Sequence, residues 1–222
     1  MYGLMCLILL FAAGGHAQDA NDARALIQRA ESLARTPKSW RAEIVETIQI
    51  SGNGIAMESK VHTKIAALAP LKMRRENSEG DQTLLVCDGA ESFYSGDGHS
   101  YYRNPAKTNQ DCDFPLRVSY LLEKDLASIS IVGRDHVLLE DGNHVCDVVR
   151  AEARVAEARW IRTMCIDPKS GLILKDVTES NREGLRLVTT ATFTSYEINP
   201  TFLPDTFRFS PPPGAVEAKS PI

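Results

Sequence analysis

The sequence predicts an α+β protein built on one large antiparallel β-sheet. Long segments alternate between apolar and polar side chains, which is typical of strands with one buried and one solvated face. Turn residues separate these segments, and just two segments show helical periodicity. Because strands and helices do not alternate along the chain, the pattern excludes a parallel sheet with crossover helices.

The first helix is expected to begin at Asp22. Apolar residues recur at helical spacing from Ala23 to Ala34, which predicts an amphipathic helix of about four turns. Asp22 can serve as its N-cap residue, and Pro37 marks its exit.

Strands are expected through most of the remaining chain. Alternation runs from residue 40 to residue 50, reverses at the turn 51–54 and continues to residue 65, which predicts a long hairpin. The further expected strands are 72–76, 83–87, 92–94, 100–103, 130–140, 144–153, 158–167, 171–179, 185–197 and 205–209.

A second helix is expected to interrupt the sheet, with Asp113 as its cap and Pro115 in its first turn. Its apolar side consists of Val118, Leu121, Leu122 and Leu126. A sheet of this size tends to curl toward a barrel, which leaves a concave face that must be filled. We expect the two helices to cover that face, either closing the core or forming a removable lid.

Composition excludes several classes of function. The 222 residues carry 29 acidic and 25 basic side chains, for a net charge of −4, so no strong positive field is available for a nucleic acid. The longest uninterrupted apolar run, Leu4 to Ala13, has ten residues, whereas a membrane-spanning helix needs about 20.

That apolar run fits an export signal. Gly15 and Ala17 supply the small residues that a signal peptidase requires, which predicts a signal peptide over residues 1–17. The alternative is a buried N-terminal strand or helix. The mature chain is then a single domain over residues 18–222.

Signal removal leaves four cysteines, Cys87, Cys112, Cys146 and Cys165. An even number in an exported chain predicts two disulfides, with three connectivities open. Metal ligation is the alternative, but the sequence has no Cys-x-x-Cys motif and no histidine at ligand spacing.

Pairing of Cys146 with Cys165 is preferred because these residues fit one hairpin closing around residues 154–157. In that register Glu152 lies opposite Arg159, and opposite charges face each other. The other two cysteines then form the second bridge.

Signals for enzyme chemistry are missing from the sequence. It has no Gly-x-Ser-x-Gly elbow, His-Glu-x-x-His motif, Walker loop or dinucleotide-binding glycine fingerprint. The histidines of the mature chain lie beside turns or on the polar sides of expected strands. We therefore expect a non-enzymatic protein without a cofactor or a metal.

The order of several short segments resembles the LolA/LolB-like outer-membrane lipoprotein carrier family. These segments are Cys87-Asp88-Gly89, Phe93-Tyr94, Tyr101-Tyr102-Arg103-Asn104-Pro105, the turn from Asp167 to Leu172 and the ending from Phe207 to Ala215. The resemblance implies an unclosed β-barrel with helices over its mouth. The function it implies is periplasmic transport of lipid or lipoprotein acyl chains, with membrane-associated donor or acceptor proteins as further partners. Secretion is the alternative to a periplasmic localisation.

Under this hypothesis the acyl chains contact apolar residues of the sheet and the lid. The expected ligand-binding residues are Trp40, Ile44, Ile48, Met57, Val61, Leu121, Leu122, Leu126, Phe193 and Phe207.

Two alternatives stay open. One is an envelope-stress sensor or regulatory module of the same fold that binds a membrane protein partner. Such regulators carry an additional C-terminal domain, for which we expect no room after the proline-rich tail. The other is a secreted hydrolase, which requires serine, histidine and aspartate side chains in one cleft.

Overall fold

The structure is a computed structural model and describes residues 12–78, 83–108, 112, 126–155 and 158–219. Its helices are α1 (Ala12–Ala34) and the 3-10 turn η1 (Ala106–Thr108). Its strands are β1 (Ser39–Gly52), β2 (Ile55–Leu68), β3 (Lys72–Asn77), β4 (Leu84–Asp88), β5 (Glu91–Ser95), β6 (Ser100–Pro105), β7 (Leu126–Leu139), β8 (Gly142–Val155), β9 (Ala158–Ile166), β10 (Ile173–Arg182), β11 (Leu185–Ile198) and β12 (Val216–Glu217).

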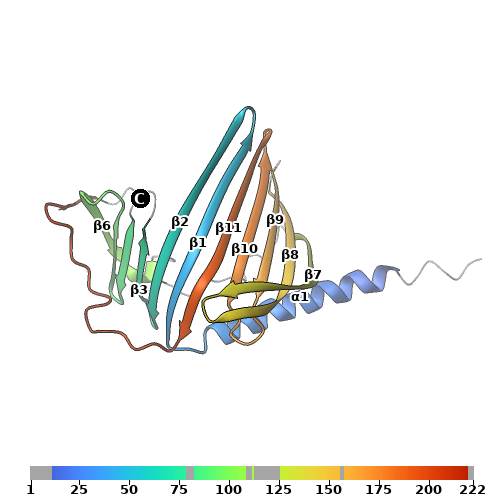
Figure 1. The fold of residues 1–222 in the computed structure, drawn as a ribbon, viewed down its shortest axis with the longest axis horizontal. Helices are drawn as coiled ribbons and strands as arrows, with labels where there is room; N and C mark the ends of the chain where they lie inside the picture. Colours follow the sequence, from blue (N-terminus) through green and yellow to red (C-terminus); the bar gives the residue numbers. More distant parts are fainter. Residues whose placement is uncertain (1–11, 79–82, 109–111, 113–125, 156–157, 220–222) are drawn as a thin grey trace, which may run out of the picture.

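All twelve strands form one sheet in the order β12-β6-β5-β4-β3-β2-β1-β11-β10-β9-β8-β7. Neighbouring strands run antiparallel, except that β12 is parallel to β6. The sheet curls, and its edges β12 and β7 do not pair with each other (Figure 1). The predicted α+β class with a large, curled and unclosed sheet is therefore confirmed, with one parallel pair added.

Helix α1 begins ten residues before the predicted cap, so the prediction for Asp22 is wrong. Ala17, Gln18 and Ala20 before Asp22 favour a helix, and the helix continues upstream through Gly14 and Gly15 in spite of their low helix propensity. Its buried residues Ala23, Ile27 and Ala30 pack with Val149 and Met164 of the sheet. None of the described helices combines the length and apolarity needed to cross a membrane.

The second predicted helix lies outside the described residues for 113–125. Its last predicted residue, Leu126, is the first residue of strand β7, so the prediction that it belongs to the helix is wrong. Coverage of the concave face by two helices is thus not confirmed: the described helix α1 packs over β7, β8 and β9.

Strand register divides the sheet into two faces, because paired residues point to the same side. Successive partners across β2, β1, β11, β10, β9 and β8 are Val61, Glu46, Ala191, Asp176, Met164 and Val149. Since α1 packs on the last two, we call this side the helix face. The opposite side, here called the tail face, carries Arg41, Ala66, Arg74, Val86, Phe93 and Arg103.

The β7–β8 hairpin closes the core over one end of the sheet. The β7–β8 register shifts between Ile131 and Gly133, and the hairpin tip reaches the lower end of β11 (Figure 1). The Glu140 amide donates a hydrogen bond to the Thr194 carbonyl oxygen at 2.9 Å. Buried side chains of the tip thereby join the main core cluster, which includes Trp40.

The turn after β9 fixes the sheet against α1. The carboxylate of Asp167 accepts hydrogen bonds from the amide and the hydroxyl of Ser170 and from the Tyr196 hydroxyl. Burial raises the pKa of Asp167, but these hydrogen bonds outweigh it and hold the pKa below its ordinary value of 3.8. Gly171 has φ +73° and lies directly against the backbone of Ala30 in α1.

The predicted strand at 205–209 is wrong. This segment crosses the tail face outside the sheet ladder, and the later pair Val216–Glu217 forms β12. The alternation of Phe207, Arg208 and Phe209 resembles that of a strand. The ring of Phe207 instead packs on Phe202 and the ring of Phe209 on Phe93. The prolines that follow lack the amide donors that a strand needs.

Both preferred disulfides are present. Cys87 pairs with Cys112 at a Cα–Cα distance of 5.8 Å, and Cys146 pairs with Cys165 at 5.3 Å. The predicted hairpin register is wrong by two residues, because Cys165 is the direct partner of Val148. Diagonal neighbours on one face remain close enough for the bridge to form.

We expect each disulfide to stabilise the fold by about 3 kcal/mol, because each closes a loop of moderate length in the unfolded chain. Replacing Cys146 and Cys165 together by serine should lower the free energy of unfolding in urea by this amount. Reductant should then lower the stability of this variant further, through the remaining bridge. Equal stability of the parent chain with and without reductant contradicts the prediction.

Gly171→Ala should be far more destabilising than Gly98→Ala. The two glycines share nearly the same φ, +73° and +70°, but an added Cβ meets the α1 backbone at Gly171 and open space at Gly98. Gly98→Ala should cost about 1–2 kcal/mol for its left-handed backbone, and Gly171→Ala at least about 2 kcal/mol more. Thermal unfolding measures both, and equal losses contradict the packing argument.

Candidate functional site

The helix face brings together six of the ten predicted ligand-binding residues. These six are Trp40, Ile44 and Ile48 of β1, Met57 and Val61 of β2 and Phe193 of β11. They lie on one side because the period-two alternation of each strand is kept through the paired register. The structure thus places them together, while their contact with a ligand stays a prediction.

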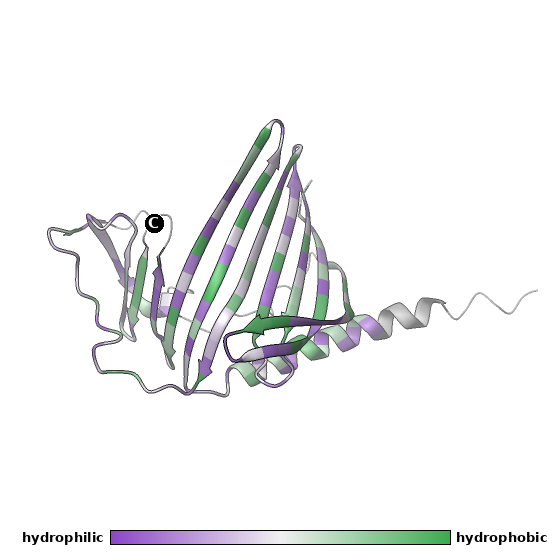
Figure 2. Ribbon diagram, viewed as in Figure 1, coloured by the Kyte–Doolittle hydropathy of each residue, from purple (hydrophilic) through white to green (hydrophobic). Residues whose placement is uncertain are grey.

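Burial of these residues falls steadily along the strands. Trp40 is 2% exposed and Phe193 8% exposed, and both belong to the main core cluster, with Ile44 packed against it. Ile48 and Val61 are half-buried, and Met57 near the far end of the hairpin is 64% exposed. An apolar stripe therefore leads from the closed core to the open end of the sheet, where hydrophobic and hydrophilic residues still alternate (Figure 2).

The other four predicted residues do not join this stripe as expected. Phe207 is buried, but it packs with Phe202 on the tail face, where it lines a groove with Phe93. Its assignment to the same site as Trp40 is therefore wrong, since the tail does not continue the strand alternation. Leu126 belongs to β7, and Leu121 and Leu122 lie outside the described residues.

Three apolar residues missing from the prediction extend the stripe. Ile50, Leu187 and Trp160 occupy one cross-strand row with Met57, and Trp160 is 40% exposed. Strand alternation alone could have identified Ile50 and Leu187. Placing Trp160 in this row requires knowledge that β9 pairs with β10, which the sequence does not provide.

A belt of polar side chains crosses the stripe at mid-height. The Arg162 guanidinium donates hydrogen bonds to both carboxylate oxygens of Asp176, with Nε–Oδ distances of 2.8 and 2.9 Å. Their side chains are 16% and 22% exposed. Glu46 lies in the same row as Asp176, and Arg162 lies in the row of Ile48. The open part of the helix face is therefore amphipathic.

A cavity of about 210 Å³ opens beside the buried end of the stripe. Trp40, Ala67 and Leu71 supply apolar wall, and Lys38 and Lys72 also line it. Within the described ranges, no group of three or more His, Cys, Asp or Glu side chains is arranged to hold a metal ion.

Breaking the Arg162–Asp176 pair should destabilise the protein because the remaining charge stays half-buried. Arg162→Met or Asp176→Leu should each lower the unfolding free energy by about 2 kcal/mol, less than a fully buried pair loses. The double variant should lose less than the sum of the two. Arg186 forms an ion pair with Glu179, and its side chain is 54% exposed. Arg186→Met is therefore the control, and it should lower the unfolding free energy by less than about 1 kcal/mol. Additive losses in urea denaturation contradict this coupling.

Comparisons with known proteins identify relatives by structure alone. Scans against protein-family models and against curated protein sequences find no match to this chain. A structure of Pseudomonas aeruginosa MucB with MucA matches with a TM-score of 0.55 and 17% identity, covering 85% of this chain and 61% of that chain. A structure of MucB alone matches with a TM-score of 0.57 and 19% identity, covering 86% of this chain and 64% of that chain.

The lipoprotein LppX of Mycobacterium tuberculosis matches with a TM-score of 0.50 and 11% identity, covering 82% of this chain and 98% of that chain. The chain thus spans nearly all of LppX but less than two thirds of the MucB chains. One LolA superfamily protein, from Nitrosomonas europaea, is also among the matches, at a TM-score of 0.38. At these identities the likeness to MucB and LppX shows the fold alone.

Proposed function

We propose that this protein is a non-enzymatic periplasmic carrier that binds lipid or the acyl chains of lipoproteins on the helix face. The apolar stripe that continues from the core to the open end of the sheet carries this proposal. A stripe used for packing alone would end where the core ends, whereas this one continues past Ile48 to the exposed Met57.

Acyl chains suit this surface on energetic grounds. Each buried CH₂ group contributes about 0.8 kcal/mol, so a weakly specific apolar stripe gains affinity with chain length. The flexible side chain of Met57 adapts to variable shapes. Arg162 and Asp176 offer hydrogen-bonding groups for the polar end of the same ligand.

The two disulfides support the proposed compartment. Two disulfides form and persist in oxidising environments, which supports an extracytoplasmic protein. A signal peptide over residues 1–17 is the proposed route of export, with membrane-associated donor and acceptor proteins as the proposed partners of the mature chain.

A second candidate is a regulatory module that binds a membrane protein partner. The structural match to MucB, which has been crystallised in complex with the segment MucA(peri), favours this candidate. Mass spectrometry of the natively purified protein separates the two functions. Bound lipid in molar amounts supports the carrier, whereas a lipid-free protein that co-purifies with a membrane protein supports the regulatory module.

Ile48→Glu should weaken binding of a fluorescent fatty-acyl probe by roughly tenfold or more, about 1.4 kcal/mol, because it places a charge in the apolar stripe. Thr47→Glu is the matched control: its side chain is also half-buried on β1 but points to the tail face. It should change probe affinity by less than about twofold. Fluorescence titration measures both, after thermal unfolding has shown that both variants fold.

Equal loss in the two variants, or no uptake of the probe by the parent chain, rules out the helix face as the acyl-binding surface.

A further inference from the structure

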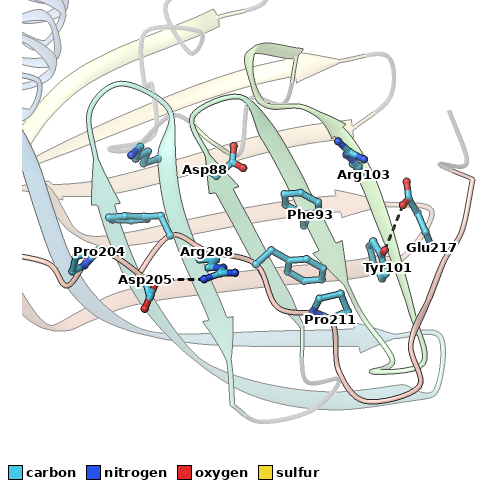
Figure 3. A pocket seen from close by; sticks show the side chains of 12 residues that line it. Asp88, Phe93, Tyr101, Arg103, Pro204, Asp205, Arg208, Pro211 and Glu217 are labelled. Atoms are coloured by element: carbon cyan, nitrogen blue, oxygen red, sulfur yellow. Dashed lines mark hydrogen bonds and ion pairs between the residues drawn. The ribbon is translucent and has the colours of Figure 1, made fainter.

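The tail face carries a second candidate binding site, separate from the acyl-binding stripe. Residues 207–217 cross it and end on the edge strand β6 (Figure 3). The ring of Phe209 stacks on Phe93 with centroids 4.7 Å apart and planes at 5°, and it contacts Tyr101 at 5.1 Å. The Val216 amide then donates to the His99 carbonyl oxygen at 3.1 Å.

This tail is attached over a short stretch. The β12–β6 pairing covers two residues, and the Val216 side chain is 65% exposed. Arg208 of the tail pairs with the nearby Asp205 rather than with the sheet, at 3.9 Å, and both side chains are about four-fifths exposed. Within the tail, the buried Phe207 and the stacked Phe209 supply most of the packing, and the residues after Phe209 are mostly exposed. Segments with so few buried contacts open locally far more often than the core unfolds.

The tail does not fill the space beneath it. A groove of about 440 Å³ remains between the strands and the tail, with Lys72, Asp88, Phe93 and Arg103 on the sheet side (Figure 3). Among the described residues, no carboxylate forms an ion pair with the Lys72 ammonium. A ligand with an acidic group can therefore use this charge.

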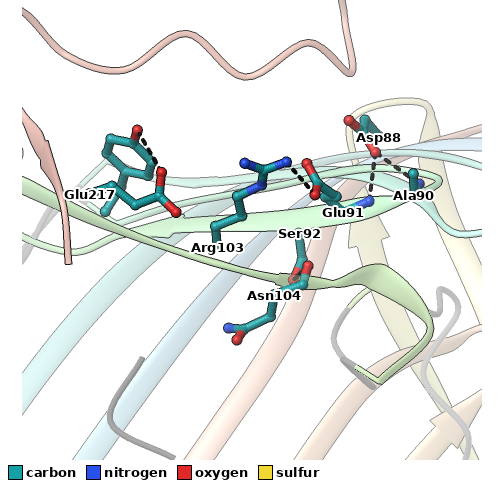
Figure 4. A network of polar contacts seen from close by, with 8 residues as sticks. Asp88, Ala90, Glu91, Ser92, Arg103, Asn104 and Glu217 are labelled. Atoms are coloured by element: carbon teal, nitrogen blue, oxygen red, sulfur yellow. Dashed lines mark hydrogen bonds and ion pairs between the residues drawn. The ribbon is translucent and has the colours of Figure 1, made fainter. Parts of the chain in front are cut away.

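The sheet itself positions the walls of the groove. Arg103 donates to the Glu91 carboxylate (Figure 4). The Arg103 guanidinium also lies over the Phe93 ring, 5.9 Å from its centroid. Asp88 accepts the amides of Ala90 and Glu91, each at 2.8 Å. Because these contacts do not involve the tail, the sheet side of the groove keeps its arrangement when the tail leaves, and a new segment that replaces the tail finds this wall already formed.

We propose that the β6 edge and the Phe93–Tyr101 platform form a docking groove for an extended segment of a partner protein, and that residues 207–217 occupy it in cis. The partner segment carries an aromatic residue for the platform, prolines that keep it extended, and an acidic residue for Lys72. An exposed strand edge binds such a segment through main-chain hydrogen bonds, and adjacent pockets select its side chains.

A labelled peptide with the sequence of residues 205–219 tests the groove in the full-length chain by fluorescence anisotropy. A cis segment competes at high effective concentration, so the parent chain should bind the peptide weakly. Phe209→Ser loosens the tail and should tighten peptide binding by roughly tenfold or more. Leu203→Ser, at a 79% exposed position shortly before the tail, is the matched control and should behave like the parent.

Phe93→Ala added to the Phe209→Ser chain should weaken peptide binding by roughly tenfold, because it removes the platform. Val216→Pro, which deletes the bond to His99, replaces Phe209→Ser if that variant does not fold. Failure of both loosened chains to bind, or binding that survives Phe93→Ala, overturns the proposal. A stable dimer of the parent chain with exchanged tails also overturns it, because the groove then joins two copies.

Discussion

The packing of the returning β7–β8 tip over one end of β1 and β11 is the constraint on which the rest of this structure depends. A twelve-stranded open sheet has more apolar surface than the single described long helix can cover. Bending the hairpin back places Val137 and Leu139 against Trp40 and Phe193. This closes one end of the helix face with the sheet's own residues and leaves the far end of the long strands open.

The two disulfides lie at this closed end of the sheet and fix its geometry. Cys146 and Cys165 belong to the same buried cluster as Cys87 and Cys112, so both bridges reinforce the core end. The open end has no covalent constraint among the described residues. A rigid base with a freer apolar extension is the arrangement that a surface for variable acyl chains requires, because the base keeps the strands aligned while the far end adapts.

Sequence reasoning predicted the strands well because alternation reports directly on a two-faced sheet. It placed Ile44, Ile48 and Val61 on one face, since alternation within a strand needs no knowledge of the neighbouring strands. Cross-strand register was predicted less well, because the β8–β9 hairpin is shifted by two residues. This shift preserves the side of each residue and the disulfide, but it changes the direct partner of each residue.

Phe207 was misplaced because it lies beyond the last long strand, where alternation no longer reports on the face. The Arg162–Asp176 pair required knowledge of which strand lies beside β9.

The proline-rich tail has a consequence for solubility. An open sheet presents unpaired main-chain groups at its edges, and such edges promote association between copies in β-rich proteins. At the β6 edge, β12 satisfies part of this hydrogen-bonding capacity, and Pro211, Pro212 and Pro213 beside it cannot donate to a further strand. The segment that covers the β6 edge thus also shields it from a second copy, so the detachment proposed for partner binding would expose this edge to association between copies.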